Sequence, residues 1–297
     1  MTNPPNQDQT QVATPVCYRH PGRPTYVSCT RCGRPACPDC LRPAAVGHQC
    51  LDCVRGGNQT VRRPTGRFGG AISSGARVTQ ALIALNVVLY LILLAHPSLA
   101  VDWGMLSRAT TVNGQLEGVA AGQWYRLLTS AFLPPTGGLG LLDIAFNLWA
   151  LLIVGPPMER QLGGVRYIAV YLASAIGGSV AFYFLAPQNE LALGASGAIF
   201  GLFGAWFVIA RRLRLDARAV VFLIVVNLAL DFAARHYIAW QAHVGGLVTG
   251  GLLTAAYVYA PRRNRGALQL TATVAVLAIL ALGVIIRDNQ LVGAVLG

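Results

Sequence analysis

The 297-residue sequence contains no lysine and little charge of any kind. Charged residues make up 11% of the chain and hydrophobic residues 54%, whereas an ordinary soluble domain carries about 25% charged residues. This composition excludes two or three average soluble domains, and it excludes a disordered chain, which combines low hydrophobicity with high net charge. The 23 basic residues, all Arg, give a formal charge of +12. That charge would suit a nucleic-acid-binding protein unless the positions of the arginines have another explanation.

The apolar residues are unevenly placed. Residues 1–78 are polar and contain all seven cysteines, and long apolar windows recur from Ala81 onward. These windows lie near 80–96, 141–158, 165–186, 196–210, 218–234, 238–260 and 267–286. Because a bilayer takes about 20 apolar residues per helix, with roughly 17 tolerated, we expect seven transmembrane helices, two of them short. We expect no signal peptide, since the first apolar run starts near residue 80, and the first helix should act as an uncleaved anchor.

The arginines indicate how the chain is oriented. On an alternating path, ten lie before the first helix and nine in the 2–3, 4–5 and 6–7 connections, all on one side. The four on the other side are Arg108, Arg126, Arg235 and Arg287. Cytoplasmic loops are enriched in Lys and Arg, so we predict a multi-pass membrane protein with a cytoplasmic N-terminus and an external C-terminus. The net charge then reports topology, and we expect no nucleic-acid partner.

The polar head carries four pairs of residues that bind metals, each pair with a two-residue gap. The pairs are Cys17 and His20, Cys29 and Cys32, Cys37 and Cys40, and Cys50 and Cys53. Such gaps are typical of zinc sites, and two tetrahedral zinc ions need the eight ligands that these residues supply. A disulfide scaffold is the alternative, which a reducing cytoplasm disfavours. His48 lacks a partner at this spacing, and we interpret it as a bystander.

A head of this size buries too small a core to fold without help, so two structural Zn²⁺ ions should supply most of its folding energy. Spacing alone does not show which pairs share an ion, and we favour a crossed arrangement in which alternate pairs do. Closed cysteine-rich sites leave no open coordination position. We therefore expect the head to have a role in binding, with a cytoplasmic protein as its partner, or a role in regulation. We expect no cofactor in catalysis.

Few polar residues lie inside the predicted membrane helices, and each is a functional candidate because burial there is costly. They are Asp143, Asn147, Ser174, Ser196, Asn227, Asp231 and His243. Ser196 lies near a predicted helix start, where free N–H groups could stabilise an oxyanion. Glycines flank both Ser196 and His243 at helical spacing and would let the two helices approach closely. That approach would pair a nucleophile with a base, and no third member is apparent.

Taken in order, these motifs resemble the rhomboid family of intramembrane serine proteases. The matching segments are Gly194-Ala195-Ser196-Gly197, Ala242-His243-x2-Gly246-x3-Gly250, Trp124-Tyr125-Arg126, Phe146-Asn147 and Gly155-x3-Glu159-x3-Gly163. The resemblance covers residues 80–260, and the cysteine-rich head resembles the zinc-binding, B-box-like N-terminal segment of some bacterial rhomboids. It implies an all-α membrane protein: a polytopic bundle of six core helices plus a seventh C-terminal one, preceded by a small zinc-stapled cytoplasmic domain.

The resemblance also implies domain limits and a reaction. We divide the chain into a disordered tail (1–14), a zinc-binding domain (15–55), a linker (56–78) and a rhomboid-like membrane domain (79–288). Ser196 would be the nucleophile, and His243 would be the general base and later the acid.

Further residues would support this pair. Asn147 and backbone N–H groups at Gly194 and Ala195 would bind the oxyanion, and Phe200 could stack on the histidine ring. The family commonly has His where this sequence has Asp143. A carboxylate there would oppose the charge of an oxyanion unless it is protonated or turned away.

The predicted function is an intramembrane serine endopeptidase that cleaves single-pass membrane proteins near the outer face, at small or helix-breaking residues. The alternative is a weak or inactive relative that binds membrane helices, which only Asp143 supports. A transporter or channel would need more paired polar residues or visible repeats. We expect Arg126 and Glu159 to be structural, and Asp231, near the expected substrate gate, to take no direct part in the chemistry.

Overall fold

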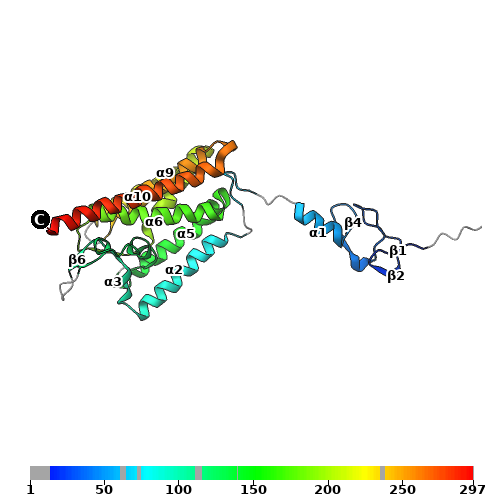
Figure 1. Ribbon diagram of the computed structural model, residues 1–297, viewed down its shortest axis with the longest axis horizontal. Coiled ribbons are helices and arrows are strands. Elements are labelled where there is room, and N and C mark those ends of the chain that lie inside the picture. The colour runs from blue at the N-terminus through cyan, green and yellow to red at the C-terminus, as the bar shows by residue number, and fades with distance from the viewer. Residues whose placement is uncertain are drawn as a thin grey trace, which may run out of the picture. The chain divides into compact units, whose positions relative to one another are not determined.

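The computed structural model describes residues 14–60, 65–71, 75–110, 116–138, 140–234 and 238–296. Residues 1–13 of the predicted tail, and Arg235, lie outside the described residues. The chain divides into two compact units, Met1–Arg63 and Pro64–Gly297, which Figure 1 shows as ribbons. The division falls within the predicted linker.

The first unit is built from two short hairpins and a helix. Strand β1 (Val16–Cys17) pairs antiparallel with β2 (His20–Pro24), and β3 (Leu41–Pro43) pairs antiparallel with β4 (His48–Cys50). The 3-10 helix η1 (Pro38–Cys40) precedes β3, and α1 (Leu51–Thr60) follows β4 and extends into the predicted linker. The buried hydrophobic cluster is small and consists of Cys17, Ala36, Cys37, Cys40 and Leu41. Most of this core is cysteine, in keeping with a domain that needs metal to fold.

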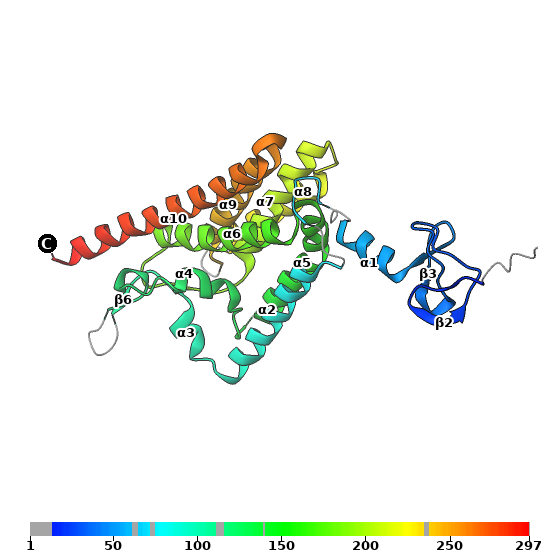
Figure 2. The same ribbon diagram turned by 45° about the vertical axis from the view of Figure 1, so that its right-hand side comes forward.

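Within its described residues, the second unit contains seven long helices, which Figures 1 and 2 show from two sides. They are α2 (Arg77–Ala95), α5 (Gly140–Leu162), α6 (Gly164–Leu185), α7 (Ser196–Leu213), α8 (Arg218–Ala233), α9 (Trp240–Tyr259) and α10 (Arg265–Leu296). Each coincides with one of the seven apolar windows, so the predicted all-α fold class is confirmed.

Five of these helical segments, among the described residues, are long and apolar enough to cross a membrane. They are Arg77–Ala95, Gly140–Leu162, Gly164–Leu185, Ser196–Leu213 and Arg262–Leu291. Helix α8 has only 16 residues, and α9 contains four glycines together with Gln241 and His243. That α8 and α9 also cross the bilayer stays a prediction.

Short elements fill the connection between α2 and α5 and tie it to the chain before α7. They are α3 (Leu99–Trp103), β5 (Met105–Leu106), β6 (Ala109–Thr110), β7 (Leu116–Glu117), η2 (Val119–Ala121), α4 (Arg126–Thr129) and η3 (Ser130–Phe132). Strand β6 pairs with β7, and β5 pairs antiparallel with β8 (Leu191–Ala192). The β5–β8 pair therefore positions the segment that leads into α7. The 3-10 helix η4 (Arg262–Asn264) precedes α10.

Arg126 holds the α2–α5 connection together. Its side chain is buried, and its Nη1 donates to the carbonyl oxygens of Val101 at 2.6 Å and Gly104 at 2.9 Å. Its Nε donates to Gln123 Oε1 at 2.7 Å. A buried guanidinium needs such partners, and these contacts are structural, as the sequence analysis expects.

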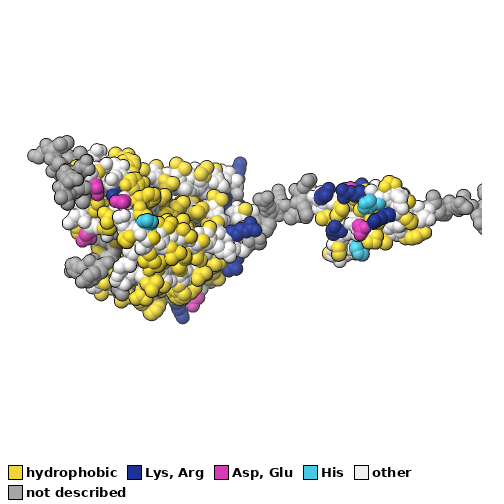
Figure 3. Space-filling model, turned by 90° about the horizontal axis from the view of Figure 1, so that it is seen from below, with side chains coloured by type: hydrophobic (Ala, Val, Ile, Leu, Met, Phe, Trp, Pro, Cys, Tyr) yellow, Lys and Arg dark blue, Asp and Glu magenta, His cyan; other side chains and the backbone are white. Residues whose placement is uncertain are grey.

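Residues 65–71 pack against one end of the helical bundle. Phe68 is buried, its N–H donates to the Gln161 carbonyl at 3.3 Å, and its own carbonyl accepts from Gln269 Nε2 at 3.0 Å. Arg265 Nη1 donates to the Arg67 carbonyl at 3.2 Å. These contacts bring the end of α5 and the start of α10 to the same end of the bundle. Figure 3 shows arginines gathered at one end of this unit and hydrophobic side chains covering its middle.

Glu159 caps a helix at this arginine-rich end. Its carboxylate accepts from the N–H groups of Val78 at 3.1 Å and Thr79 at 2.9 Å, and from the Thr79 hydroxyl at 2.9 Å. Val78 and Thr79 lie in the first turn of α2, whose N–H groups have no partner within the helix. A negative charge there is also favoured by the helix dipole. Glu159 therefore fixes α5 to the start of α2, which is the structural role expected for it.

The backbones of α7 and α9 touch. A Cβ atom added at Gly246 would lie 1.9 Å from the carbonyl oxygen of Gly197, and one at Gly250 would lie 2.3 Å from that of Gly201. Real Cβ atoms do not approach backbone oxygens so closely, so both positions require glycine. The predicted small-residue stripes therefore do bring the two helices into direct contact.

Gly246→Ala should destabilise the helical unit, because a methyl group would meet a backbone oxygen that cannot move aside. Overpacking of this kind costs typically about 1–3 kcal/mol, and we expect a lower midpoint of thermal unfolding in detergent. Gly251→Ala is the matched control, since its Cβ would meet nothing nearer than 3.8 Å. It should keep or raise the midpoint, because alanine favours helix by up to about 1 kcal/mol over glycine. Equal midpoints in Gly246→Ala and the wild type would contradict the backbone contact.

Candidate active site and metal clusters

Ser196 is the first residue of α7 and follows a sharp turn. Gly194 has a φ of +125°, a conformation that favours glycine, and its N–H donates to the Ser130 carbonyl at 3.0 Å. The turn is thus anchored to η3, and it places the half-buried Ser196 at a helix N-terminus. The N–H groups of the first helical turn have no partners within the helix. They remain as main-chain donors next to the serine hydroxyl.

The Gly194 N–H, predicted as an oxyanion donor, donates to the Ser130 carbonyl in this structure. Its role in an oxyanion site stays a prediction. Ala195 is buried directly before the helix, and its carbonyl accepts the Ile199 N–H at 3.1 Å. A donor role for the Ala195 amide stays a prediction.

The structure brings the predicted nucleophile and base together. His243 lies in the first turn of α9 and is buried, and its Nε2 is 2.7 Å from Ser196 Oγ. The ring of Phe200 stacks on the imidazole with the centroids 4.3 Å apart and the planes 8° apart. Phe200 therefore has the stacking position that the sequence analysis gave it, and it restrains the tilt of the imidazole.

A third polar group, which the sequence analysis set aside, contacts His243. Asp231, near the end of α8, has its Oδ2 2.5 Å from His243 Nδ1, and both side chains are buried. The sequence made no third member apparent and gave Asp231 no direct part in the chemistry, whereas the structure places Asp231 in contact with His243. Asp231 lies 12 residues before His243 on another helix, so spacing could not reveal the contact. A signal was present, because a single carboxylate within an apolar segment requires a partner.

Asn147 and Asp143 lie together on α5, as their spacing predicts. Asn147 is buried, and its Nδ2 donates to Asp143 Oδ2 at 3.0 Å. The same carboxylate oxygen lies 3.6 Å from the position that a Cβ of Gly194 would take. Asp143 is therefore turned toward the segment before Ser196. One N–H of the Asn147 amide is occupied, and its second N–H can still donate.

A small cavity adjoins Ser196. Its volume is about 30 Å³, which is enough to hold a water molecule. Small residues make up much of its lining, among them Ala131, Ala175 and Ala198, and the larger Met105, Phe182 and Leu193 complete it. Two hydroxyls face each other at its wall, Ser130 Oγ and Ser179 Oγ, 3.4 Å apart. The space beside the serine therefore has room for a small group.

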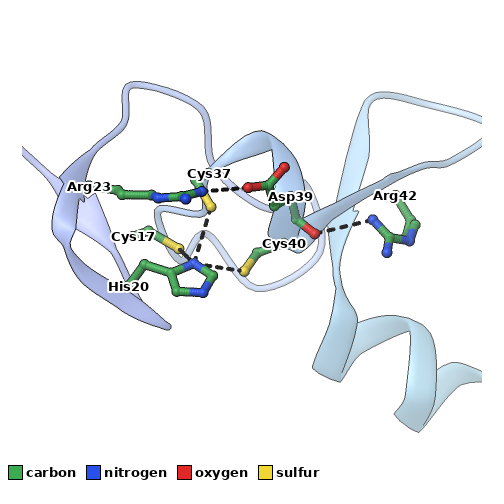
Figure 4. Close-up of polar contacts among 7 residues, drawn as sticks. All are labelled: Cys17, His20, Arg23, Cys37, Asp39, Cys40 and Arg42. Carbon is green, nitrogen blue, oxygen red and sulfur yellow. Dashed lines mark hydrogen bonds and ion pairs between the residues drawn. The ribbon is translucent and has the colours of Figure 1, made fainter.

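In the first unit, the predicted metal ligands form two tetrads. One consists of Cys17, His20, Cys37 and Cys40, and the other of Cys29, Cys32, Cys50 and Cys53, with ligand atoms within 4.8 Å of one another in each. This is the crossed grouping favoured from the sequence. Figure 4 shows His20 between the cysteines of the first tetrad, with its Nδ1 3.4 Å from the sulfurs of Cys37 and Cys40. Both tetrads could hold a metal ion.

The proton affinities of the cysteines fit a metal site. The backbone N–H of Cys50 hydrogen-bonds to the Cys29 sulfur and lowers the pKa of that thiol from 9.0 to about 6. Burial instead raises the pKa of Cys40 to about 11, and the hydrogen bond with Cys32 raises the pKa of Cys53 to about 12. Without a bound cation, the neighbouring thiols of one tetrad therefore do not all ionise. A divalent cation binds the thiolate forms and removes this conflict, so the donor set suits a soft metal with tetrahedral geometry.

Comparison with known proteins points to one family. A family model described as a Rhomboid domain matches residues 121–260. Rhomboid protease GluP of Bacillus subtilis (strain 168) is 34% identical over 209 residues, which are 68% of this chain and 38% of GluP. YdcA, a rhomboid-like protein of the same organism, is 33% identical over 182 residues, 60% of this chain and 86% of YdcA.

A fungal protein is similar over a shorter part. Rhomboid-type serine protease 2 of Emericella nidulans is 31% identical over 152 residues, which are 49% of this chain and 29% of that protein. The chain therefore spans most of YdcA but well under half the length of GluP and of the fungal protein.

Native mass spectrometry of the full chain should find two divalent ions per molecule, one for each tetrad. Cys37→Ser should remove one ion and leave the other, because its tetrad keeps only three ligands while the second is untouched. Cys29→Ser should do the same for the second tetrad. An exposed aspartate of the same unit provides the control, and Asp39→Asn should keep both ions. A wild-type chain that binds no ion, or a Cys37→Ser chain that keeps two, would contradict the assignment.

Proposed function

The chain belongs to the rhomboid family, and from this premise we propose that it is a serine-type endopeptidase that cleaves membrane proteins within the bilayer. The observation that carries the proposal is the 2.7 Å contact between Ser196 Oγ and His243 Nε2. Both residues lie in the first turns of long helices, and a nucleophile within hydrogen-bond reach of a base is the arrangement that acyl transfer needs. The names of GluP and of the fungal relative as proteases support the same reaction.

In the proposed reaction, Ser196 Oγ bonds to the scissile carbonyl carbon while His243 Nε2 takes the hydroxyl proton. The imidazolium gives that proton to the amine nitrogen as the C–N bond breaks, which leaves an acyl-enzyme. Water then attacks the ester with His243 again as base, and Ser196 recovers its proton. The second N–H of Asn147 and main-chain N–H groups at the start of α7 would stabilise the oxyanion.

The surroundings of Ser196 support a choice of substrate. The adjoining cavity of about 30 Å³ would accept a small side chain, so single-pass membrane proteins with a small residue at the cleavage point are the proposed substrates.

Arginines at one end of the bundle support a cytoplasmic N-terminus and an external C-terminus in a bacterial plasma membrane. All seven helices would then cross the bilayer, and cleavage would occur near the outer face.

The two tetrads would hold zinc. Three cysteines with one histidine, and four cysteines, are ligand sets of closed structural zinc sites. His20 would bind through Nδ1, the ring nitrogen that faces its tetrad. Zinc would supply folding energy to residues 15–55 and take no part in peptide hydrolysis. The proposed role of this unit is to bind a cytoplasmic protein partner.

A fluorophosphonate probe should label the purified wild-type protein at Ser196, and Ser196→Ala should abolish the labelling. His243→Ala should slow it by at least about 100-fold, the usual minimum for loss of a general base. Ser174→Ala is the control, because Ser174 Oγ bonds to the Val170 carbonyl of its own helix at 2.7 Å. It should label as the wild type does. Labelling that survives Ser196→Ala would reject the proposed nucleophile.

Asp143→His should preserve or raise the turnover of a membrane substrate. The reason is that a carboxylate beside Gly194 opposes the negative charge of the oxyanion, and a histidine would not. The measurement is cleavage of a single-pass substrate in detergent or vesicles. Asp216→Asn, which removes one negative charge at the exposed start of α8, should leave turnover unchanged. A collapse of turnover in Asp143→His would show that Asp143 has a role of its own.

A further inference from the structure

Asp231 is a buried carboxyl group on a helix that is otherwise largely exposed. Among the described residues of α8 only Val220 and Asp231 are buried, while the neighbours of Asp231, Leu230 and Phe232, are 58% and 60% exposed. Asp231 itself is 4% exposed. An ionisable group that faces the interior of a membrane bundle is costly unless it is paired. Asp231 therefore needs the partner that it has, the Nδ1 atom of His243.

The two nitrogens of His243 have different neighbours. Nδ1 faces the Asp231 carboxylate at 2.5 Å and Nε2 faces the Ser196 hydroxyl at 2.7 Å. An ionised carboxylate only accepts hydrogen bonds, and a neutral imidazole has one donor and one acceptor nitrogen. The carboxylate therefore selects the tautomer with the proton on Nδ1. The lone pair of Nε2 is then left for the serine proton.

We propose that Asp231 is a positioning residue that completes a Ser196–His243–Asp231 triad. The inference rests on the proposed protease function and adds a member to its machinery. Asp231 holds the imidazole in the tautomer that accepts the Ser196 proton at Nε2, and it stabilises the imidazolium that results. The Nδ1 proton stays on the ring and Asp231 stays ionised, so the proton that leaves Ser196 is the one delivered to the amine.

Phe200 cannot replace this contact. Its ring lies parallel to the imidazole and so restrains the ring plane, but a stacked hydrocarbon ring does not distinguish the two nitrogens. A second carboxylate that interacts electrostatically with His243 is Asp143 on α5. Its Oδ2 accepts from Asn147 and faces the Gly194 side. Asp231 is the carboxylate with a hydrogen bond to the imidazole.

The first test is the rate of fluorophosphonate labelling of Ser196 as a function of pH in Asp231→Asn. The asparagine keeps the shape but donates its amide N–H to Nδ1, which stabilises the wrong tautomer. We expect the rate to fall by about 10²- to 10⁴-fold. Loss of general base catalysis costs rates in this range, and loss of a triad carboxylate lies at its upper end. The midpoint of the pH profile should move to lower pH, because the imidazolium loses its counter-charge. Asp216→Asn makes the same charge change at the exposed start of α8 and should alter neither quantity.

The second test does not depend on activity. In Ser196→Ala protein with ¹⁵N-labelled histidine, proton NMR should show a strongly downfield resonance coupled to Nδ1 of His243, and His243→Ala assigns it. Adding Asp231→Asn should remove this resonance, and adding Asp216→Asn should retain it. If wild-type Ser196 does not react with the probe, the proposed protease function fails, and the NMR result alone decides the role of Asp231.

Two results would overturn the inference while leaving the protease intact. One is an Asp231→Asn protein that labels at the wild-type rate with the wild-type pH midpoint. The other is a slower rate with an unmoved midpoint and an unchanged Nδ1 resonance, which is what a merely structural carboxylate on α8 would give. Loss of the resonance together with a shifted midpoint supports the triad.

Discussion

Two backbones come into direct contact where α9 passes α7 at Gly246 and Gly197. Ser196 is next to Gly197, and His243 lies one turn before Gly246, so this contact sets the separation of the hydroxyl and the imidazole. A 2.7 Å hydrogen bond does not tolerate a displacement of an ångström. The position of the functional groups therefore depends on the absence of two side chains. The hydrophobic membrane environment adds nothing to helix association, so close packing has to hold the pair.

The imidazole is then held from several directions. Phe200 of α7 covers its face, Ser196 meets one nitrogen, and Asp231 of α8 meets the other. Each contact restrains a different degree of freedom: the plane, the reacting direction and the protonated nitrogen. A buried polar atom without a partner is costly. The three contacts satisfy the imidazole and together fix its orientation.

Features that repeat within one segment could be predicted from the sequence. The seven apolar windows, the Cys-x2-Cys pairs and the glycines at helical spacing all describe neighbours along the chain, and the structure has elements or contacts at each. The pairing of Ser196 with His243 could be reached because both carry glycine stripes. Asp231 could not be placed, since it has no motif of its own and meets His243 only through the packing of α8. The hydrogen bond from the Gly194 N–H to the Ser130 carbonyl joins segments far apart in the sequence, and neither segment carries a motif that predicts it.

The arginine-rich end of the bundle has a chemical consequence. Guanidinium groups stay protonated at any pH that a cell experiences, whereas ammonium groups can lose their proton on burial or their charge by acylation. Positive charge at the ends of α5, α6 and α10 is supplied by arginine alone, since the sequence contains no lysine. Acetylation of lysine amines, which removes surface charges in many proteins, has no lysine to modify in this sequence. The positive charge at this end of the bundle is therefore permanent.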